Sequence, residues 1–563
     1  MIETIEKVVQ QALTIAGYSL ETPRIIPSNR PDLCDYQCDD IFKLAKIYKE
    51  SPLIIGEKII ATLEKQEESK FYFQQVQFIA PGFLNFKLSD QFINEQLNQM
   101  LNQPKFAMKM PEPELYFLDY GGPNIAKPLH VGHFRSAVVG EAINRILKYA
   151  NQTTISDVHL GDYGLQIGQV IYGILEDQKK EEEITLAYLE ELYPKISGKC
   201  KEDEQIKTIC EQITKDLQDG NPKYQHLWKI ILEVSGNDIK RLYHYLDIHF
   251  DLWKGESDAY PYIKGLQEEL EEKQLLLASD GAQVIPVSEA TDPKEIPPLI
   301  FQKSNGAYLY GTTDLATIKE RQETYAPDHY IYIVDLRQSL HFEQVFRVTK
   351  KAALAPKATF EFCGFGTING MDGKPFKTRK GDAPKLDSLF AQVKEIFIAK
   401  KQENQTMSEE NIDKIVNAIL KFADLQNNRE RNYIFDLAKF SEVIGKTGPY
   451  ILYTSVRIKK LLTEVPATSF QTAIYNETDR ILRMKLLELP LAFQSSLKER
   501  MPHYLADYVY ELCVTANNFY QNNRLNELED HEKKQQWLLL LTLTNQVLIE
   551  MLYLLVMEVP TEM

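Results

Sequence analysis

The sequence predicts a doubly wound α/β domain, with an α+β domain before it and an all-helical bundle after it. Three observations support this. A short strand at 115–120 leads through the loop GGPN into a long helix, which is the opening unit of such a fold. Strand-like segments follow at 154–159, 330–334 and 359–364, with helical patterns between them. From about 405 onward, long amphipathic helices continue without a convincing strand.

Composition and charge narrow the function classes. With 563 residues, the chain is long enough for three or four domains of ~150 residues. The net charge of −16 argues against a protein that coats nucleic acid or membranes, and it confines nucleic-acid contact to local basic patches. Six scattered cysteines favour a reducing cytoplasm over a disulfide scaffold, and Cys34 and Cys38 lack a second pair that would complete a metal site.

The first two domains are separated by a proline-rich joint. Residues 1–108 alternate helical and strand-like patterns, with two strands expected around the Pro-Gly turn of 71–86. The joint KMPEPE then opens the α/β domain, expected at 109–404. Within it, the charged and mostly helical stretch of about 165–275 is interpreted as an insertion.

The helical bundle is expected at 405–563. Its most apolar run, 537–557, contains Asn545, Gln546 and Glu550. Because these side chains would be costly to bury in lipid, the run is predicted to be the central helix of a packed bundle and not a membrane span.

Two histidines stand at the start of the helix that follows the first strand. His130 and His133 are one turn apart, so both rings can project from that turn, and Gly132 leaves the backbone open to a flat ligand. A helix N-terminus with Lys127 nearby is suited to bind a triphosphate. The two imidazoles could stabilise the charge that develops when a carboxylate attacks the α-phosphate, and this attack needs no general base because a carboxylate is already a nucleophile. The alternative is that both histidines only cap the helix, and that interpretation is preferred for the four residues HVGH taken alone.

A glycine-framed basic segment, GKPFKTRKG at 373–381, is the second cluster. It follows a strand of the α/β domain, and its cations would neutralise a pyrophosphate leaving group: Lys374, Lys377, Arg379 and Lys380. A solvated surface loop is the alternative interpretation. Since the pattern GxxxxGK[ST] is absent from the sequence, a kinase- or ATPase-type phosphate loop is unsupported.

These motifs resemble the arginyl-tRNA synthetase family of class I aminoacyl-tRNA synthetases. HVGH is similar to the HIGH sequence of that class. Further similar segments occur in order along nearly the whole chain: DYQCDDIFKLAK, PGFLNF, LDYGGPNIAKPLHVGHFRSAVVGEA, HLGDYGLQIG, GESDAY, IPPLIFQKSNGAYLYGTTDLA, RQSLHFEQVF, GKPFKTRKG, GPYILYTSVRI and VPTEM.

The resemblance implies a Rossmann-like catalytic fold and a reaction. ATP and L-arginine would form arginyl-adenylate and pyrophosphate, and the arginyl group would pass to the 3′ end of tRNA(Arg), with activation typically dependent on the tRNA. It also implies Mg²⁺ with ATP, no structural metal, no DNA or membrane partner, a monomer and a cytoplasmic location.

The resemblance also implies roles for individual residues. ATP would be held by His130, Gly132, His133, Lys127 and Arg379. Arginine would be bound by six residues: Asp119, Asn124, His159, Tyr310, Asp314 and Gln338. Paired carboxylates suit the planar guanidinium. From the residues alone, Asp314 would instead be a helix N-cap and Tyr310 a core aromatic.

The sequence departs from the family pattern at three places. The KMSKS sequence, whose second lysine usually acts in catalysis in this class, is not intact here. The resemblance implies that Lys127 takes over the role of that lysine, with a contribution from Lys380 or Lys377. The sequence does not decide how the role is divided among these lysines. Gly121 and Gly122 replace serines found in many relatives, and Asp119 stands where relatives often carry Glu.

Two regions are expected to contact tRNA(Arg). In the bundle, which resembles the family's anticodon-binding domain, Tyr450, Tyr453 and Arg457 share one helical face and Met563 would close the same pocket, a set suited to unstacked loop bases. In the first domain, Phe83 and Asn85 are candidates for a D-loop base. The alternative for both regions is ordinary core packing.

Two other functions remain as alternatives. One is a different class I synthetase or a nucleotidylyltransferase, although Asp119 and Asp314 suit a cationic substrate. The other is a synthetase-like tRNA-binding protein without catalysis, against which the complete HVGH motif and the basic loop argue.

Overall fold

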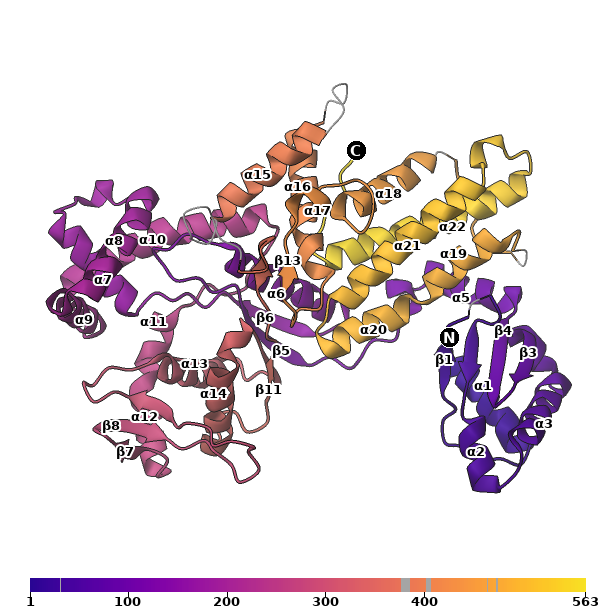
Figure 1. The fold of residues 1–563 in the computed structure, drawn as a ribbon, viewed down its shortest axis with the longest axis horizontal. Coiled ribbons are helices and arrows are strands. Elements are labelled where there is room, and N and C mark those ends of the chain that lie inside the picture. The colour runs from indigo at the N-terminus through magenta and orange to yellow at the C-terminus, as the bar shows by residue number, and fades with distance from the viewer. Residues whose placement is uncertain (31, 376–384, 401–406, 463, 472–473) are drawn as a thin grey trace. The chain divides into compact units, whose positions relative to one another are not determined.

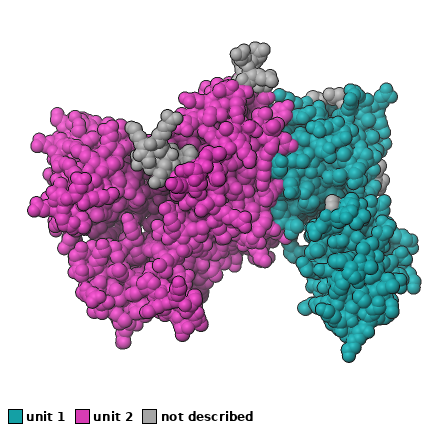
Figure 2. Space-filling model, viewed as in Figure 1, with its two compact units in different colours: residues 1–109, 454–493, 508–550 teal, residues 110–453, 494–507, 551–563 magenta. Residues whose placement is uncertain are grey.

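The chain folds into the elements drawn in Figure 1, a computed structural model that describes all residues except 31, 376–384, 401–406, 463 and 472–473. These elements form two units, coloured separately in Figure 2. Unit 1 contains residues 1–109, 454–493 and 508–550, and unit 2 contains residues 110–453, 494–507 and 551–563.

The N-terminal part of unit 1 is an antiparallel sheet covered by helices. The strands are β1 (Ile25–Pro27), β2 (Tyr36–Cys38), β3 (Phe73–Ile79) and β4 (Phe83–Leu88), in the order β1-β2-β4-β3. The predicted hairpin around the Pro-Gly turn is confirmed as β3 and β4. The helices are α1 (Ile2–Ile15), α2 (Ile41–Tyr48), α3 (Pro52–Lys65), α4 (Glu67–Tyr72) and α5 (Asp90–Asn102).

Unit 2 is built on a parallel sheet with the strand order β11-β10-β5-β6. The four predicted strands are confirmed as β5 (Leu115–Tyr120), β6 (Thr153–Asp157), β10 (His329–Ile333) and β11 (Thr359–Phe362). From β5 the chain moves outward to β6, and later from β10 outward to β11, so the order reverses between β5 and β10. In such sheets, ligands bind beyond the carboxyl ends of the strands at this reversal.

Helices connect the strands of this sheet. Helix α6 (Val131–Tyr149) joins β5 to β6, and its apolar face is buried as predicted. The helices α13 (Tyr310–Thr324) and α14 (Ser339–Ala352) flank β10. Side chains of α13 and α14 form one core with Phe117, Tyr330 and Tyr332 from the strands.

The insertion between β6 and β10 is helical where predicted. It contains α7 (Leu165–Glu176), α8 (Leu186–Glu202), α9 (Glu204–Gln218), α10 (Pro222–Tyr245), α11 (Glu256–Ala259) and α12 (Ile263–Glu272). A small antiparallel sheet that the sequence analysis did not predict follows, formed by β7 (Leu277–Ser279), β8 (Ala282–Ile285) and β9 (Leu299–Gln302). These strands have three or four residues, too short for a clear alternating pattern.

The C-terminal region is helical, with one correction. Its helices are α15 (Leu386–Lys400), α16 (Glu409–Leu425), α17 (Leu437–Phe440), α18 (Gly448–Leu461), α19 (Glu477–Leu487), α20 (Leu489–Glu499), α21 (His503–Asn522) and α22 (His531–Leu554). The expectation that no strand follows residue 405 is wrong, because β13 (Tyr433–Ile434) pairs in parallel with β12 (Ile368–Asn369). A strand of two residues that pairs with a segment far away in the sequence leaves no alternating pattern in its own segment.

The apolar run forms α22, as predicted. Among the described residues, α22 is the one helix that is long and apolar enough to cross a membrane, but 72% of its apolar window is buried inside the protein. Its buried Asn545 has an internal partner in unit 1, since its Oδ1 accepts a hydrogen bond from Ser455 at 2.7 Å. These features fit the core helix of a bundle.

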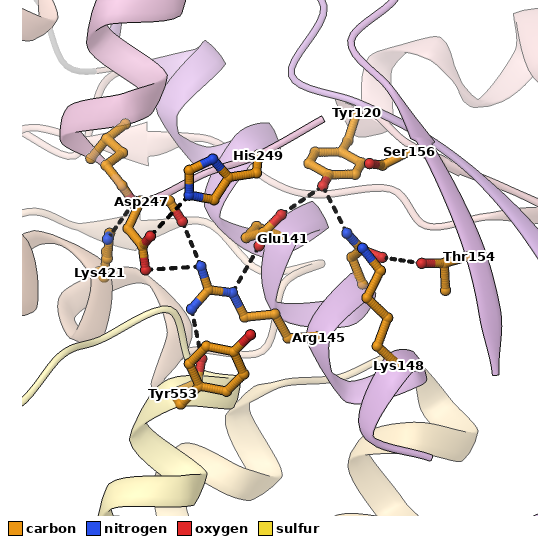
Figure 3. Close-up of polar contacts among 12 residues, drawn as sticks. Tyr120, Glu141, Arg145, Lys148, Thr154, Ser156, Asp247, His249, Lys421 and Tyr553 are labelled. Atoms are coloured by element: carbon orange, nitrogen blue, oxygen red, sulfur yellow. Dashed lines mark hydrogen bonds and ion pairs between the residues drawn. The ribbon is translucent and has the colours of Figure 1, made fainter. Parts of the chain in front are cut away.

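A buried arginine anchors α6 within unit 2 (Figure 3). Arg145 is 5% exposed, and its Nε contacts the Glu141 carboxylate at 2.7 Å. Its other nitrogens donate to the Tyr553 carbonyl at 3.0 Å and to the Asp247 carboxylate at 3.0 Å. Glu141 also accepts a bond of 2.8 Å from the hydroxyl of Tyr120, the last residue of β5. The helix that carries HVGH is therefore fixed to the strand that leads into it.

Lys421 of α16 lies beside this cluster and makes stability depend on pH. The side chain is 1% exposed and its Nζ donates to the Leu246 carbonyl at 2.5 Å. Burial and then the charge of Arg145 lower the pKa of Lys421 to about 7, against the opposing effect of the carboxylates of Asp247 and Glu141. In the unfolded chain the same group titrates near its ordinary pKa of about 10.4.

We predict that this lysine destabilises the fold more at pH 7 than at pH 9. In that range the unfolded state binds more protons than the folded state, so raising the pH stabilises the wild type by about 2 kcal/mol relative to Lys421→Met. Melting temperatures of both proteins at each pH test this. Lys264→Met is the control, because Lys264 is 89% exposed. If the difference in melting temperature between the wild type and Lys421→Met is the same at both pH values, the prediction is contradicted.

Candidate active site

Helix α6 begins directly at the two histidines. Nδ1 of His130 accepts a hydrogen bond from the Gly132 N–H at 3.0 Å, and the His130 N–H donates to Nδ1 of His133 at 3.3 Å. The rings stack with centroids 3.9 Å apart. The histidines therefore do cap the helix, which starts at Val131. Capping uses only Nδ1 of each ring and leaves both Nε2 atoms to bind a ligand.

Both histidines favour the neutral form. Burial lowers the pKa of His130, and the cations of Lys127 and Arg337 lower it further. Burial also lowers the pKa of His133 well below its ordinary value, with contributions from His130 and Lys127. Because a neutral imidazole whose Nδ1 accepts a hydrogen bond carries its proton on Nε2, each ring offers an Nε2–H donor. Such donors at a helix N-terminus suit phosphate oxygens.

Tyr193 lies beside Lys127 at the start of α6. Nζ of Lys127 lies over the ring of Tyr193, 4.6 Å from its centroid. Partial burial raises the pKa of Tyr310, and the electrostatic influence of Glu256, Tyr193 and Asp314 raises it further. Tyr193 therefore interacts with both Lys127 and Tyr310.

The alternative interpretations of Tyr310 and Asp314 are wrong. Tyr310 is 60% exposed, so it is not a core aromatic. Leu309 is the N-cap of α13, which places Asp314 inside the helix instead of at its cap. The Asp314 carboxylate contacts Nε2 of His341 at 2.5 Å. Burial opposes protonation of His341, but the hydrogen bond with Asp314 outweighs it and raises the pKa above its ordinary value.

Asp119 lies at the end of β5, next to a buried arginine that the sequence analysis missed. Nη2 of Arg321 is 2.7 Å from the Asp119 carboxylate and 2.8 Å from that of Asp157. Nδ1 of His159 lies 3.7 Å from Asp157. Arg321 stands 202 positions after Asp119, so no local pattern links them. The four groups form a compact set of two carboxylates and two cationic nitrogen bases.

Burial and neighbouring charges set the protonation of this set. For His159, burial opposes the cation, but Asp157 and Asp119 outweigh it and raise the pKa to about 9. Burial raises the pKa of Asp119 in spite of Arg321. Burial also raises the pKa of Tyr332, and the carboxylates of Asp119 and Asp314 raise it further.

Asn124 and Gln338 stand at the carboxyl edge of the sheet. Asn124 pairs with Gly161 in a parallel bridge, and its Oδ1 accepts a weak hydrogen bond of 3.4 Å from Gln166. A Cβ at Gly161 would lie 2.3 Å from Oδ1 of Asn124, so this close approach requires glycine. Gln338 ends a short 3₁₀ turn after β10 and is exposed. Its neighbour Arg337 pairs with Asp335 at 2.6 Å.

The chain that follows the predicted basic segment pairs with the start of α6. Three of its candidate residues lie outside the described residues: Lys377, Arg379 and Lys380. Lys374 is described and exposed. Directly after the segment, Lys385 forms an antiparallel bridge with His130, and the Leu386 N–H donates to the Leu129 carbonyl at 2.9 Å. The chain on the C-terminal side of the basic segment therefore lies beside HVGH.

Glu256 is a further acidic side chain that the sequence analysis did not single out. It is 9% exposed, and burial raises its pKa to about 7, with Asp162 and Asp314 raising it and His159 lowering it. The motif GESDAY contains it. Asp162 fixes this motif by accepting hydrogen bonds from the Ser257 N–H at 3.0 Å and the Ser257 hydroxyl at 2.6 Å.

The candidates for tRNA contact differ in exposure. In unit 2, Tyr453 is 43% exposed, whereas Tyr450 and Met563 are half-buried. In unit 1, the Arg457 guanidinium lies over the Tyr520 ring at 4.0 Å.

In the N-terminal sheet of unit 1, Phe83 packs edge-on against Phe42 with centroids 5.5 Å apart. Asn85 is 4% exposed, and its Oδ1 accepts a hydrogen bond from Gln37 at 2.9 Å. In this arrangement its amide oxygen is already used within the sheet.

Comparisons with known proteins cover the whole chain. Family models match in three places: "tRNA synthetases class I (R), catalytic domain" at residues 96–437, "Arginyl tRNA synthetase N terminal domain" at 3–88 and "DALR anticodon binding domain" at 451–563. Arginine–tRNA ligase of Agathobacter rectalis is 41% identical, over 97% of both chains. That of Alkaliphilus oremlandii is 39% identical over the full length of both.

Solved structures agree. The arginyl-tRNA synthetase of Plasmodium falciparum superposes with a TM-score of 0.81 at 26% identity, over 100% of this chain and 99% of that one. The Thermus thermophilus arginyl-tRNA synthetase has a TM-score of 0.79 over all of both chains; at 22% identity this likeness supports the fold alone.

Proposed function

The chain belongs to the class I arginyl-tRNA synthetases and is an arginine–tRNA ligase, and we propose that the residues gathered at the start of α6 and along the carboxyl edge of the sheet perform its reaction. The observation that carries this assignment is the placement of the His130 and His133 rings, which cap α6 through Nδ1 and keep Nε2 for a ligand, in the helix that follows the strand carrying Asp119.

In the first step, the arginine carboxylate attacks the α-phosphorus of ATP and pyrophosphate leaves. The Nε2–H groups of His130 and His133 donate to phosphate oxygens as negative charge shifts onto them, and the N-terminus of α6 adds its positive dipole end. Gly132 leaves room for the nucleotide. Since the attacking carboxylate is already ionised, no side chain has to remove a proton.

Lysines complete the phosphate site. Lys127 carries a positive charge at the start of α6, and its place over Tyr193 leaves its ammonium free to donate to a phosphate oxygen. We propose that Lys377, Arg379 and Lys380 act on the leaving pyrophosphate, since the chain after them pairs with His130. Mg²⁺ is proposed to enter with ATP and to be held mainly by its phosphates.

The substrate arginine is proposed to lie between two carboxylates. Asp119 and Asp314 would each accept hydrogen bonds from the guanidinium, beside Tyr310 and Gln338. The amino-acid end would lie against Asn124 and His159. A protonated His159, with its pKa of about 9, suits the substrate carboxylate.

We further propose three domains and their tRNA contacts. The boundaries are 1–108, 109–404 and 405–563. The first domain would contact the D-loop through Phe83 and Asn85, and the last would hold anticodon bases with four residues: Tyr450, Tyr453, Arg457 and Met563. Binding of tRNA(Arg) by an acidic protein is expected to use local basic patches and to weaken with salt. A cytoplasmic monomer is proposed.

Pyrophosphate exchange tests the proposed function. We expect exchange with arginine that appears on adding tRNA(Arg), and a preference for arginine over lysine of about 10⁴ or more, because unpaired buried acids reject a substrate with fewer donors. The assay uses arginine, lysine and methionine, each with and without the tRNA. Exchange with another amino acid would identify a different synthetase. Tight tRNA binding with no exchange under any condition would indicate a tRNA-binding protein without catalysis.

A further inference from the structure

Arg321 is the one side chain among the described residues that contacts both Asp119 and Asp157. Its Nη2 lies 2.7 Å from Oδ2 of Asp119 and 2.8 Å from Oδ2 of Asp157. Its exposure is 0%, and its guanidinium carbon lies over the Phe117 ring, 4.3 Å from the centroid. This arginine is therefore enclosed by the end of β5, the end of β6 and its own helix α13.

The two carboxylates held by Arg321 differ in their access to the site. The Asp157 side chain is 0% exposed, whereas that of Asp119 is 13% exposed. Both contacts to Arg321 use Oδ2, and Oδ1 of Asp119 receives no hydrogen bond from Arg321. Of the two acids, only Asp119 can present an oxygen to a substrate.

Asp157, which Arg321 holds in place, in turn contacts the imidazole and the backbone of His159. Its Oδ2 lies 3.7 Å from Nδ1 of His159, and its Oδ1 accepts the backbone N–H of His159 at 3.3 Å and of Lys254 at 3.1 Å. A carboxylate fixed at both oxygens cannot turn away from the imidazole. Arg321 thus contacts one candidate substrate-binding residue, Asp119, directly and orients a second, His159, through Asp157.

We propose that Arg321 is a positioning residue for arginine recognition: an internal guanidinium that fixes Asp119 in its substrate-binding orientation and, through Asp157, fixes His159. This inference rests on the proposed binding of arginine by Asp119 and His159. It deepens that proposal by naming a group that never touches the substrate yet sets the site's selectivity for it.

The charge of Asp119 depends on the same contact. Asp119 is faced by Arg321 of α13, by Asp157 at the end of β6, by His159 just after it, and by Tyr332 of β10. Burial raises the pKa of Asp119 even with Arg321 present. Without the guanidinium, the carboxyl takes up a proton more readily and loses its attraction for a cationic substrate.

The test compares Arg321→Lys with the wild type in tRNA-dependent pyrophosphate exchange. The lysine Nζ ends one bond short of the position of Nη2, the single nitrogen that contacts both carboxylates, so we expect the KM for arginine to rise about tenfold to one hundredfold. The KM for ATP should stay within twofold. Arg347→Lys is the matched control, because Arg347 also pairs with an acid whose side chain is largely shielded from solvent, Asp292, here through two guanidinium nitrogens.

Arg321→Met supplies the second readout. If it gives a cooperative melting transition, its arginine KM relative to the wild type should fall as the pH rises over the range in which the protein stays folded, since Asp119 then loses its proton. If R321M does not fold, R321M/D157N, which removes one buried charge, is measured in the same way.

An inactive wild type would refute the proposed function itself. With an active wild type, the inference is overturned by an unchanged arginine KM in R321K, by equal rises for arginine and ATP, or by the same effect in R347K. A pH-independent KM ratio in the methionine variant would also overturn it.

Discussion

Replacing His130 by asparagine is expected to lower the rate of pyrophosphate exchange by about 10² to 10³, while glutamine at the same position keeps most of the activity. The loss corresponds to one hydrogen-bond donor to the reacting phosphate, worth about 3–4 kcal/mol in the transition state. Asparagine reaches only the position of Nδ1, so it can still cap α6. Glutamine is one methylene longer, and its amide nitrogen can reach the position of Nε2.

The asparagine and glutamine pair separates catalysis from capping. His133 is expected to behave in the same way, because its Nδ1 also accepts a backbone hydrogen bond. His329→Asn is the control: His329 lies at the amino end of β10, where it contacts Glu114 at 2.9 Å, and exchange should stay within twofold. If the two variants of His130 lose equal activity together with their melting temperature, its role is only to cap the helix.

The pH dependence of this step follows from the same geometry. Burial and the neighbouring cations lower the pKa of both histidines, so the rings are already neutral donors below their ordinary range. The exchange rate at saturating substrates should therefore show no loss on passing from pH 6 to pH 7. A rate that falls as the pH rises through 6.5 would mean that an imidazolium is required.

The sequence predicts the parts of this site that depend on local spacing. The two histidines one turn apart, the buried face of α6 and the four parallel strands all leave periodic signals over short stretches. The hairpin of β3 and β4 does so too. In each case the residues that make the structure are neighbours along the chain, so pattern alone identifies them.

The missed features are pairings across long separations. Arg321 meets Asp119 from 202 positions away, and each is an ordinary charged residue in its own segment. His341 and Asp314 are 27 positions apart and lie on different helices. The strands β12 and β13 are only two residues each. Where a distant partner decides the structure, local propensity carries no signal.

The second large effect is expected at Asp314. Replacing it by asparagine removes the charge but little volume, and the substrate guanidinium then loses a charge-assisted hydrogen bond in a partly buried site. We expect the KM for arginine to rise about one hundredfold or more, since breaking one half of such a pair costs about 2–5 kcal/mol. The KM for ATP should change less than threefold. Steady-state exchange with each substrate varied in turn measures both.

His341 makes this effect depend on pH. When protonated, it neutralises Asp314 at 2.5 Å and competes with the substrate guanidinium for the same oxygens. Since Asp314 raises the pKa of His341, the competitor persists above the ordinary titration range and is lost as the pH rises further. The KM for arginine should therefore fall with rising pH in the wild type and change less in His341→Asn. If the KM for arginine of Asp314→Asn keeps the pH dependence of the wild type, then His341 acts on another group. In that case the substrate does not compete with His341 for Asp314.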